Sequence, residues 1–223
     1  MECLAILQAR LSSKRLPGKV LTKINGKPLI AYQIERILRS KRISGLVVAT
    51  STEESDRALV EYCKSNSIAV EAGPLDQVAS RFRGVIKKYK PSSFVRICGD
   101  SPWYDPHLLD QGIELFQSGD YEIVCNILPR TFPKGVSIEI FSSSTFEREF
   151  PELSKKYDME SFTTYFYDAK ERFKIGTFKA DKDYSMNNLC VDTAQDLERF
   201  SKAITSASKP PADYSWKEAL SFI

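Results

Sequence analysis

A cationic loop directly follows a short apolar run near the start of the chain. Residues 4–21 are LAILQARLSSKRLPGKVL, and the loop contains Arg10, Arg15, Lys19, two serines and a Pro-Gly turn. An apolar run without polar alternation is typical of a strand buried on both faces of a parallel sheet. Open α/β sheets bind their ligands at the carboxyl ends of such strands. Cations, hydroxyls and backbone N–H groups there favour a bound polyphosphate, and the alternative is a solvated surface turn.

This loop matches neither of two well-known phosphate-binding motifs. The Walker A motif requires Gly-Lys followed by Ser or Thr, whereas Gly18-Lys19 is followed by Val20. The dinucleotide fingerprint requires three glycines after the strand, and Gly18 is the first glycine that follows the apolar run. Both motifs are therefore excluded.

A carboxylate is expected at the same edge of the sheet. Residues 95–102, VRICGDSP, form an apolar run that ends at Gly99-Asp100. A carboxylate beside a bound triphosphate is repelled unless a divalent cation lies between them, and Mg²⁺ accepts one or two carboxylates together with phosphate oxygens and water. The alternative is a simple turn in which Asp100 bonds to its own backbone.

Asp192 is a second candidate carboxylate, since it follows another apolar run in LCVDTAQDLERF. The alternative is that Asp192 or Thr193 caps the helix that follows, and the residues alone favour the cap, although both roles can coexist. Glu139 is expected on the polar face of a strand, where its usual neighbour is water. His107 is the only histidine and is expected to be exposed in a first helical turn, so Ser-His-Asp catalysis has little support.

Length and composition predict one globular domain over residues 1–223. The 32 basic and 29 acidic residues leave a net charge of only +3, without a basic stripe, which argues against nucleic-acid binding. No apolar run is long enough to span a membrane, and the first ten residues do not resemble a signal peptide. The five cysteines form no Cys-x-x-Cys pair and are expected to be reduced and buried, which indicates the cytoplasm.

Strand-like and helix-like segments alternate through the first half of the chain. Buried strands are expected at residues 45–51, 67–73 and 93–100. Helices are expected at 28–40, 54–66, 78–90 and 105–119, the last opened by Asp105 as the N-cap. This alternation predicts an α/β fold, a mostly parallel sheet flanked by helices.

The second half of the chain has a different pattern. Residues 121–142 indicate two strands joined by a loop with Pro and Gly, so an antiparallel excursion is expected at about 120–145. A helix over 143–150, a strand over 173–180, and a short strand and capped helix over 188–204 are expected to follow. Residues 206–223 are predicted to be a surface linker and a terminal helix docked through Trp216, Leu220 and Phe222.

The chain resembles the cytidylyltransferases that activate acidic sugars as CMP derivatives, including the acylneuraminate and 3-deoxy-manno-octulosonate enzymes. It is most similar to the spore-coat polysaccharide branch, the SpsF-like proteins. The resemblance covers about residues 3–205. The segments that carry it are QARLSSKRLPGK (8–19), VVATS (47–51), RICGDSPWYDP (96–106), NILPRTFPKG (126–135) and VDTAQDL (191–197).

The resemblance implies a Rossmann-like nucleotide-diphosphosugar transferase fold and transfer of CMP from CTP to a sugar hydroxyl, with release of pyrophosphate, in the synthesis of cell-surface polysaccharide. It implies a homodimer, with the antiparallel excursion in the interface, and Mg²⁺ held by Asp100 and Asp192. Three residues are expected to be catalytic: Arg10, Lys19 and Asp100. Further nucleotide contacts are expected from the backbone of Leu7, Gln8 and Ala9 and from Ser13, Arg15, Ser51 and Asp76. The acceptor is expected to contact Asn126, Arg130, Glu139 and Glu160.

Two segments depart from the pattern of the spore-coat branch. Relatives usually have Asp-Gly-Leu-Asp-Val-Glu where this chain has KGVSIE at 134–139, and Glu-His where Glu160 precedes Ser161. Both segments belong to the acceptor side, so the sequence leaves the acceptor open. Other nucleotidyltransferases with a different base or a polyol-type acceptor, and a non-catalytic nucleotide-binding protein, remain alternatives. A glycosyltransferase is disfavoured because it would normally have Asp-x-Asp where this chain has Gly99-Asp100-Ser101.

Overall fold

The computed structural model describes residues 2–156 and 161–223. A seven-stranded sheet in the order β5-β4-β1-β6-β8-β7-β9 forms its centre. Its strands are β1 (Cys3–Gln8), β4 (Ile43–Ser51), β5 (Ala69–Gly73), β6 (Ser93–Cys98), β7 (Ile123–Cys125), β8 (Glu139–Ser142) and β9 (Ile175–Thr177). Two short strands, β2 (Lys23–Ile24) and β3 (Lys27–Pro28), form a separate hairpin.

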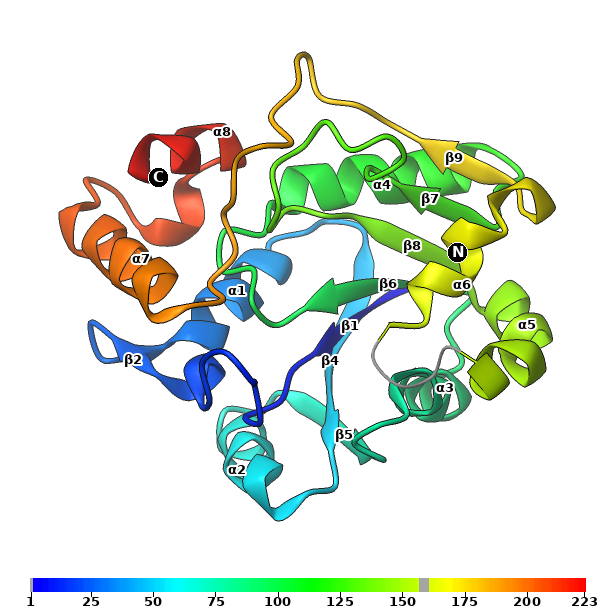
Figure 1. Cartoon of the computed structure of the whole chain (residues 1–223), viewed down its shortest axis with the longest axis horizontal. Helices are drawn as coiled ribbons and strands as arrows, with labels where there is room; N and C mark the ends of the chain where they lie inside the picture. Colours follow the sequence, from blue (N-terminus) through cyan, green and yellow to red (C-terminus); the bar gives the residue numbers. More distant parts are fainter. Residues whose placement is uncertain (1, 157–160) are drawn as a thin grey trace.

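Helices cover both faces of the sheet (Figure 1). One face carries α1 (Leu29–Ile37), α2 (Arg57–Ser65), α4 (Pro106–Ser118), α7 (Ala194–Ser206) and the short α8 (Trp216–Ala219). The other carries α3 (Val78–Tyr89), α5 (Ser143–Lys156) and α6 (Thr163–Asp168). This layered α/β arrangement confirms the fold class predicted from the alternation of elements. None of the helices among the described residues is long and apolar enough to cross a membrane.

The central strand β1 places its carboxyl end, and the loop that follows it, at the middle of one edge of the sheet. It pairs in parallel with β4 on one side and β6 on the other, and residues 3–7 are at most 6% exposed. Because β1, β4 and β6 point the same way, the segments that follow them meet at one edge of the sheet. The cationic loop after β1 and the Gly99-Asp100 turn after β6 therefore become neighbours.

Strand β8 is antiparallel to both β6 and β7, whereas β7 and β9 are parallel to each other. The predicted antiparallel pair within 120–145 is confirmed, but both strands lie inside the main sheet. The end of β7 and the start of β8 come to the same edge as the end of β6. The connecting residues 126–138 therefore lie beside the Gly99-Asp100 turn.

The prediction of a strand near residues 188–192 is wrong. The segment forms one isolated parallel bridge, between Asn188 and Lys134, and otherwise bonds to loops: Leu189 N–H donates to Lys134 O and Val191 N–H to Asp100 O, both at 2.8 Å. The linker before α8 lies largely at the surface, as predicted, but Ala212 and Tyr214 within it are buried. Arg36, 1% exposed, donates to the carbonyls of Pro211 and Tyr214 and so ties the terminal segment to α1.

Candidate active site

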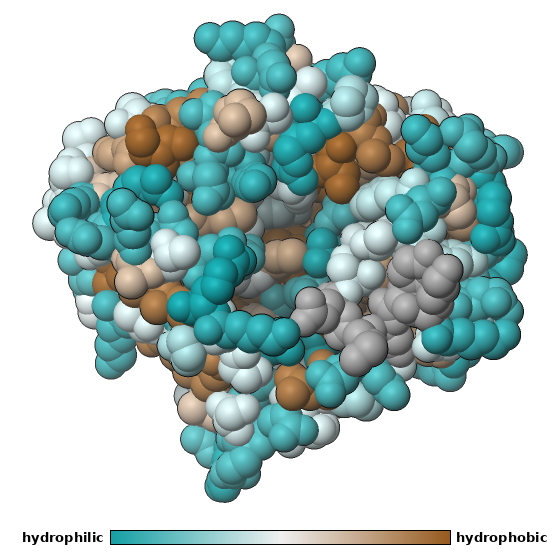
Figure 2. All heavy atoms as spheres, in the orientation of Figure 1, coloured by the Kyte–Doolittle hydropathy of each residue, from teal (hydrophilic) through white to brown (hydrophobic). Residues whose placement is uncertain are grey.

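A cavity of about 320 Å³ lies at the carboxyl edge of β1 and β6. Figure 2 shows this face of the molecule hollowed near its centre, with hydrophilic side chains around the opening. We call this space the cationic cavity, since four basic side chains and two carboxylates line it. Its lining residues are Gln8, Ala9, Arg10, Ser13, Lys14, Arg15, Lys19, Val20, Cys98, Gly99, Asp100 and Asp192.

The loop after β1 is held in shape by its own backbone. Gly18 has φ 74°, a left-handed conformation that favours glycine, and its N–H donates to Leu11 O at 2.8 Å. Leu11 N–H donates in turn to the buried carboxylate of Asp56 at 2.6 Å. The loop is therefore closed on itself and fixed to the region after β4, which directs its cations toward the cavity.

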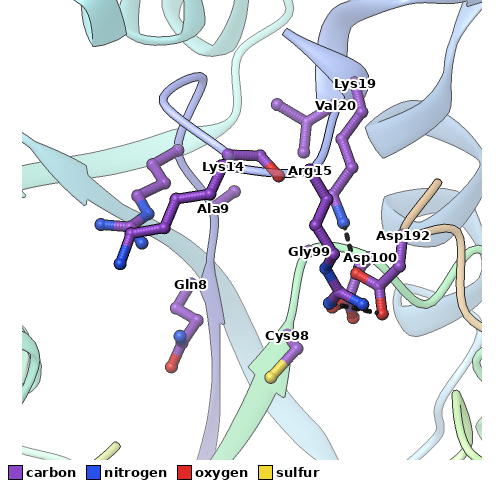
Figure 3. Close-up of a pocket in the computed structure, with 12 residues that line it drawn as sticks. Gln8, Ala9, Lys14, Arg15, Lys19, Val20, Cys98, Gly99, Asp100 and Asp192 are labelled. Carbon is purple, nitrogen blue, oxygen red and sulfur yellow. Dashed lines mark hydrogen bonds and ion pairs between the residues drawn. The ribbon is translucent and has the colours of Figure 1, made fainter. Parts of the chain in front are cut away.

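Asp192 forms ion pairs with two of these cations. Lys19 Nζ lies 2.9 Å from Asp192 Oδ1 and also donates to the carbonyl of Val191 at 2.7 Å. Arg15 lies 2.9 Å from the other oxygen, Asp192 Oδ2 (Figure 3). The helix cap is made by Thr193, whose side chain accepts from Asp196 N–H in a capping box. The two roles considered for Asp192 thus fall on two neighbouring residues, and the Asp192 side chain faces the cavity.

Asp100 lies beside Asp192 in the cationic cavity (Figure 3). Its carboxylate accepts from Ser101 Oγ at 3.0 Å and makes no ion pair with any described residue. Gly99 permits the close approach of the two strand ends, since a Cβ there would lie 2.9 Å from Ala9 Cβ and 3.0 Å from Gln8 O. The predicted meeting of the basic loop with an acidic pair is confirmed.

These two carboxylates suit a hard divalent cation. Asp100 has no cationic partner in the described part of the chain, so a nearby metal ion would compensate its charge. No group of three or more His, Cys, Asp or Glu side chains is placed to hold a metal among residues 2–156 and 161–223. Asp100 and Asp192 would therefore hold an ion only together with oxygens from a ligand and from water, as Mg²⁺ prefers.

A second cavity of about 330 Å³ adjoins the first, because Cys98 and Asp100 line both. We call it the inner cavity. It lies between the end of β6, the connection from β7 to β8, and α6. Its other lining residues are Arg96, Ser101, Tyr104, Ile127, Arg130, Lys134, Gly135, Ser137, Glu139, Thr163, Tyr167 and Cys190.

A buried ion pair connects the two cavities. Arg96 donates from one guanidinium nitrogen to Glu139 Oε2 at 2.7 Å and from Nε to Gln8 Oε1 at 3.1 Å. Tyr167 donates its hydroxyl to Glu139 Oε1 at 2.7 Å. Burial and the Glu139 carboxylate raise the pKa of Tyr167 well above its ordinary value, so this hydroxyl keeps its proton and remains the donor. Glu139 thus lines the inner cavity. Both of its carboxylate oxygens accept hydrogen bonds, and Arg96 neutralises its charge.

Two basic side chains in the inner cavity have no such counter-charge. Arg130 donates to Ser137 Oγ at 3.1 Å, and neither Arg130 nor Lys134 forms an ion pair with a described residue. This part of the inner cavity therefore carries positive charge that a ligand can neutralise.

The two thiols at the site are neutral. Burial raises the pKa of Cys98 to about 12, and burial together with the nearby carboxylates of Asp100 and Asp192 raises the pKa of Cys190. Neither thiol is therefore an activated nucleophile at neutral pH. All five cysteines of the chain are free.

Several predicted site residues lie elsewhere. Leu7 and Asn126 are 0% exposed, and the Asn126 amide bonds to the backbone of its own loop. Ser51 turns its hydroxyl inward to the carboxylate of Asp56, and Asp76 is exposed outside the cationic cavity. None of these four residues lines the cationic or the inner cavity, and the contacts expected of them remain predictions. For Leu7 the expected contact is made by the backbone, which the burial of its side chain does not test. Glu160 lies outside the described residues. His107 is exposed, as predicted.

Other residues at the site were not singled out from the sequence. Tyr167 lines the inner cavity without a motif that predicts it, and Lys134 was noted only as part of the KGVSIE segment on the acceptor side. Arg96 offered a signal, because a charged side chain within the apolar strand VRIC needs a buried partner. Its partners, Glu139 and Gln8, are distant in sequence and become evident only in the folded sheet.

Comparison with known proteins agrees with this architecture. Residues 4–203 match the model of the cytidylyltransferase family. The chain is 31% identical to the spore coat polysaccharide biosynthesis protein SpsF of Bacillus subtilis, over 100% of this chain and 94% of that protein. A cytidylyltransferase structure from Leptospira borgpetersenii superposes with a TM-score of 0.90 at 29% identity, covering 99% of this chain and 93% of that one.

A more distant structure shows the same fold. CMP:2-keto-3-deoxy-manno-octonic acid synthetase, in complex with CTP, superposes with a TM-score of 0.71 at 17% identity over 92% of this chain and 99% of that one. The Rossmann-like nucleotidyltransferase fold implied by the sequence is thereby confirmed. With a cationic loop and an acidic pair meeting at the end of β1 and β6, and with a family match over nearly its whole length, the chain belongs to the cytidylyltransferase family.

Proposed function

We propose that the protein transfers CMP from CTP to a hydroxyl of an acidic sugar, with release of pyrophosphate and with Mg²⁺ as cofactor. The observation that carries this proposal is the pair of adjoining cavities with Asp100 in the wall of both. A transferase for two substrates needs such a shared wall, because the two reacting groups must meet there.

The cationic cavity fits the triphosphate of CTP. Arg10, Lys14, Arg15 and Lys19 supply four positive charges against the two carboxylates, so the cavity favours a polyanion. Mg²⁺ bound at Asp100 and Asp192 would neutralise phosphate charge and act as a Lewis acid at the transferred phosphoryl group. Lys19 and Arg15 would hold the departing pyrophosphate after their ion pairs with Asp192 weaken.

The inner cavity fits an anionic acceptor. Arg96 and Glu139 neutralise each other, whereas Arg130 and Lys134 remain without an ionic partner among the described residues. A sugar carboxylate placed between these two cations would direct a hydroxyl toward the wall shared with the cationic cavity. A sugar acceptor is supported by the similarity to a spore coat polysaccharide biosynthesis protein and to CMP:2-keto-3-deoxy-manno-octonic acid synthetase.

Catalysis is then chiefly a matter of positioning and charge neutralisation. The acceptor hydroxyl attacks the α-phosphorus in line. Its oxygen forms the new P–O bond, the bond to pyrophosphate breaks, and the hydroxyl proton is released to water. Arg10 and Lys19 stabilise the charge that develops on the phosphate oxygens. Asp100 would position the reacting groups through the metal ion that it holds.

The test is pyrophosphate release from CTP, ATP, GTP and UTP, each with Mg²⁺ and a panel of acidic sugars, neutral sugars and polyol phosphates. We expect release with CTP and an acidic sugar only. Asp100→Asn should reduce the rate by at least about 100-fold, whereas the exposed Asp120→Asn should not change it. Lys134→Met should raise the KM for the acid and leave the KM for CTP unchanged.

Three outcomes would contradict the proposal. Near-normal turnover by Asp100→Asn would show that Asp100 does not hold a metal ion needed for the reaction. Turnover with a different nucleotide or with a polyol phosphate would identify another nucleotidyltransferase reaction. Calorimetric binding of CTP without turnover against any acceptor would indicate a nucleotide-binding protein without catalytic activity.

A further inference from the structure

The side chain of Gln8 lies at the junction of the two cavities. Gln8 is the last residue of β1 and lies opposite Cys98 of β6, which lines both cavities. Gln8 itself lines the cationic cavity (Figure 3). Its amide oxygen accepts a hydrogen bond from Arg96, which lines the inner cavity. If CTP occupies one cavity and the acceptor the other, the reacting atoms lie next to this amide.

Arg96 fixes which end of the amide faces the ligand. Its Nε is a hydrogen-bond donor and has no acceptor function, so only the oxygen of the Gln8 amide can face it. Rotation of the amide by 180° would place N–H groups against the guanidinium. Arg96 is itself held by Glu139, and Glu139 by Tyr167. The Gln8 Nε2 group has no partner among the described residues and therefore presents N–H groups to the cavity.

We propose that Gln8 Nε2 donates a hydrogen bond to a non-bridging oxygen of the α-phosphate of the nucleotide, and that Arg96 is the positioning residue for this contact. The proposal rests on the proposed function, because it assumes a cytidine nucleotide in the cationic cavity. Only the backbone of Gln8 was expected to contact the nucleotide, so this assigns a separate role to its side chain.

The chemistry of the two reacting groups selects the phosphate as the partner. A non-bridging phosphate oxygen is only an acceptor and gains charge in the transition state, so a fixed N–H donor stabilises it. The attacking hydroxyl oxygen must instead keep its lone pair available and lose a proton. A donor-only amide would weaken that nucleophile and could not accept its proton. The locked orientation therefore suits the phosphate oxygen.

The experiment compares the binding of CMP and of cytidine by calorimetry, with Mg²⁺ present, so that no acceptor is needed. The wild-type protein is expected to bind CMP more tightly than cytidine. Gln8→Met, which keeps the length of the side chain, should reduce this preference about tenfold, as expected for loss of one hydrogen bond to a charged group. Its affinity for cytidine should stay within about twofold. Gln8→Glu should reduce the preference further, because a carboxylate repels the phosphate.

Two further variants separate this role from a structural one. Gln111→Met makes the same chemical change on the exposed surface of α4 and should leave both affinities unchanged. Arg96→Lys retains the charge beside Glu139 and removes the Nε donor, so it should lower the CMP preference with little effect on cytidine.

The possible results are distinct. An unchanged CMP preference in Gln8→Met would overturn the proposed contact. An equal loss of CMP and cytidine affinity would also overturn it and would place Gln8 against the nucleoside. If the wild-type protein binds neither CMP nor CTP, the proposed function itself fails, and the role of Gln8 fails with it.

Discussion

Replacement of Lys19 by Met should destabilise the folded protein even without a ligand. Lys19 is 6% exposed and donates both to Asp192 and to the carbonyl of Val191, which is itself 1% exposed. Lys19→Met leaves that buried carbonyl without its partner, which costs about 1–3 kcal/mol. Asp192 retains its contact with Arg15, so its charge is not left alone. We therefore expect the free energy of unfolding to fall by about 2 kcal/mol.

Arg15→Met is the matched comparison. Arg15 contacts the same carboxylate at the same 2.9 Å, but its side chain is 65% exposed. Exposed ion pairs contribute between about 0 and 1 kcal/mol. Arg15→Met should therefore cost well under half of what Lys19→Met costs, although both variants remove one cation from Asp192.

Urea unfolding followed by tryptophan fluorescence measures both changes. The two tryptophans, Trp103 and Trp216, are 3% and 7% exposed, so their emission should report loss of the core. The prediction uses the midpoint shift at constant m-value. Equal costs for the two variants, or a cost below about 0.5 kcal/mol for Lys19→Met, would show that the bond to Val191 O contributes little. The reasoning from burial would then be refuted.

Three other perturbations test different parts of the structure. Gly99→Ala places a methyl group 2.9 Å from the side chain of Ala9, so it should cost about 1–3 kcal/mol in urea unfolding and weaken CTP binding in calorimetry. Asp105→Ala removes the N-cap of α4 and the acceptor for Trp216 N–H. It should lower the free energy of unfolding by about 3 kcal/mol. A loss below half of that would show that these buried hydrogen bonds contribute little to stability. The hydrogen bond from Lys209, with further bonds from Ser215, lowers the pKa of Glu218 from 4.5 to about 2. The bonds that the Glu218 carboxylate accepts therefore stabilise the fold above pH 4.5, and this contribution is lost as the pH falls toward 2. The melting-temperature difference between wild type and Glu218→Gln should shrink over that range, and a constant difference would exclude this linkage.

The fold and the cationic cavity were largely predictable because they depend on local sequence pattern and one topological rule. A buried strand followed by polar residues, repeated along a parallel sheet, brings the loop of Arg10, Arg15 and Lys19 to the edge where Asp100 lies. The N-cap at Asp105 was also predictable, since Asp before a proline in a first turn has a clear local cause.

The sequence was least informative where the orientation of a residue depends on its tertiary neighbours. Ser51 is the last residue of β4, at the same edge of the sheet, but its hydroxyl donates to the buried Asp56, which no local sequence pattern predicts. The stretch around Val191 is as apolar as a strand, yet its N–H groups bond to loops. The inner cavity was predicted least well, because Arg96, Glu139 and Tyr167 belong to three separate elements and meet only after the sheet forms.

The reversed direction of β8 has a consequence for how such enzymes can diversify. Because β7 ends and β8 begins at the same edge of the sheet, the two ends of the connection 126–138 lie close together. Insertions or substitutions in that connection would reshape the inner cavity while the β1 loop and the end of β6 stay as they are. Under the proposed function, changes in this connection would alter the binding of the acceptor and leave the binding of the nucleotide unchanged.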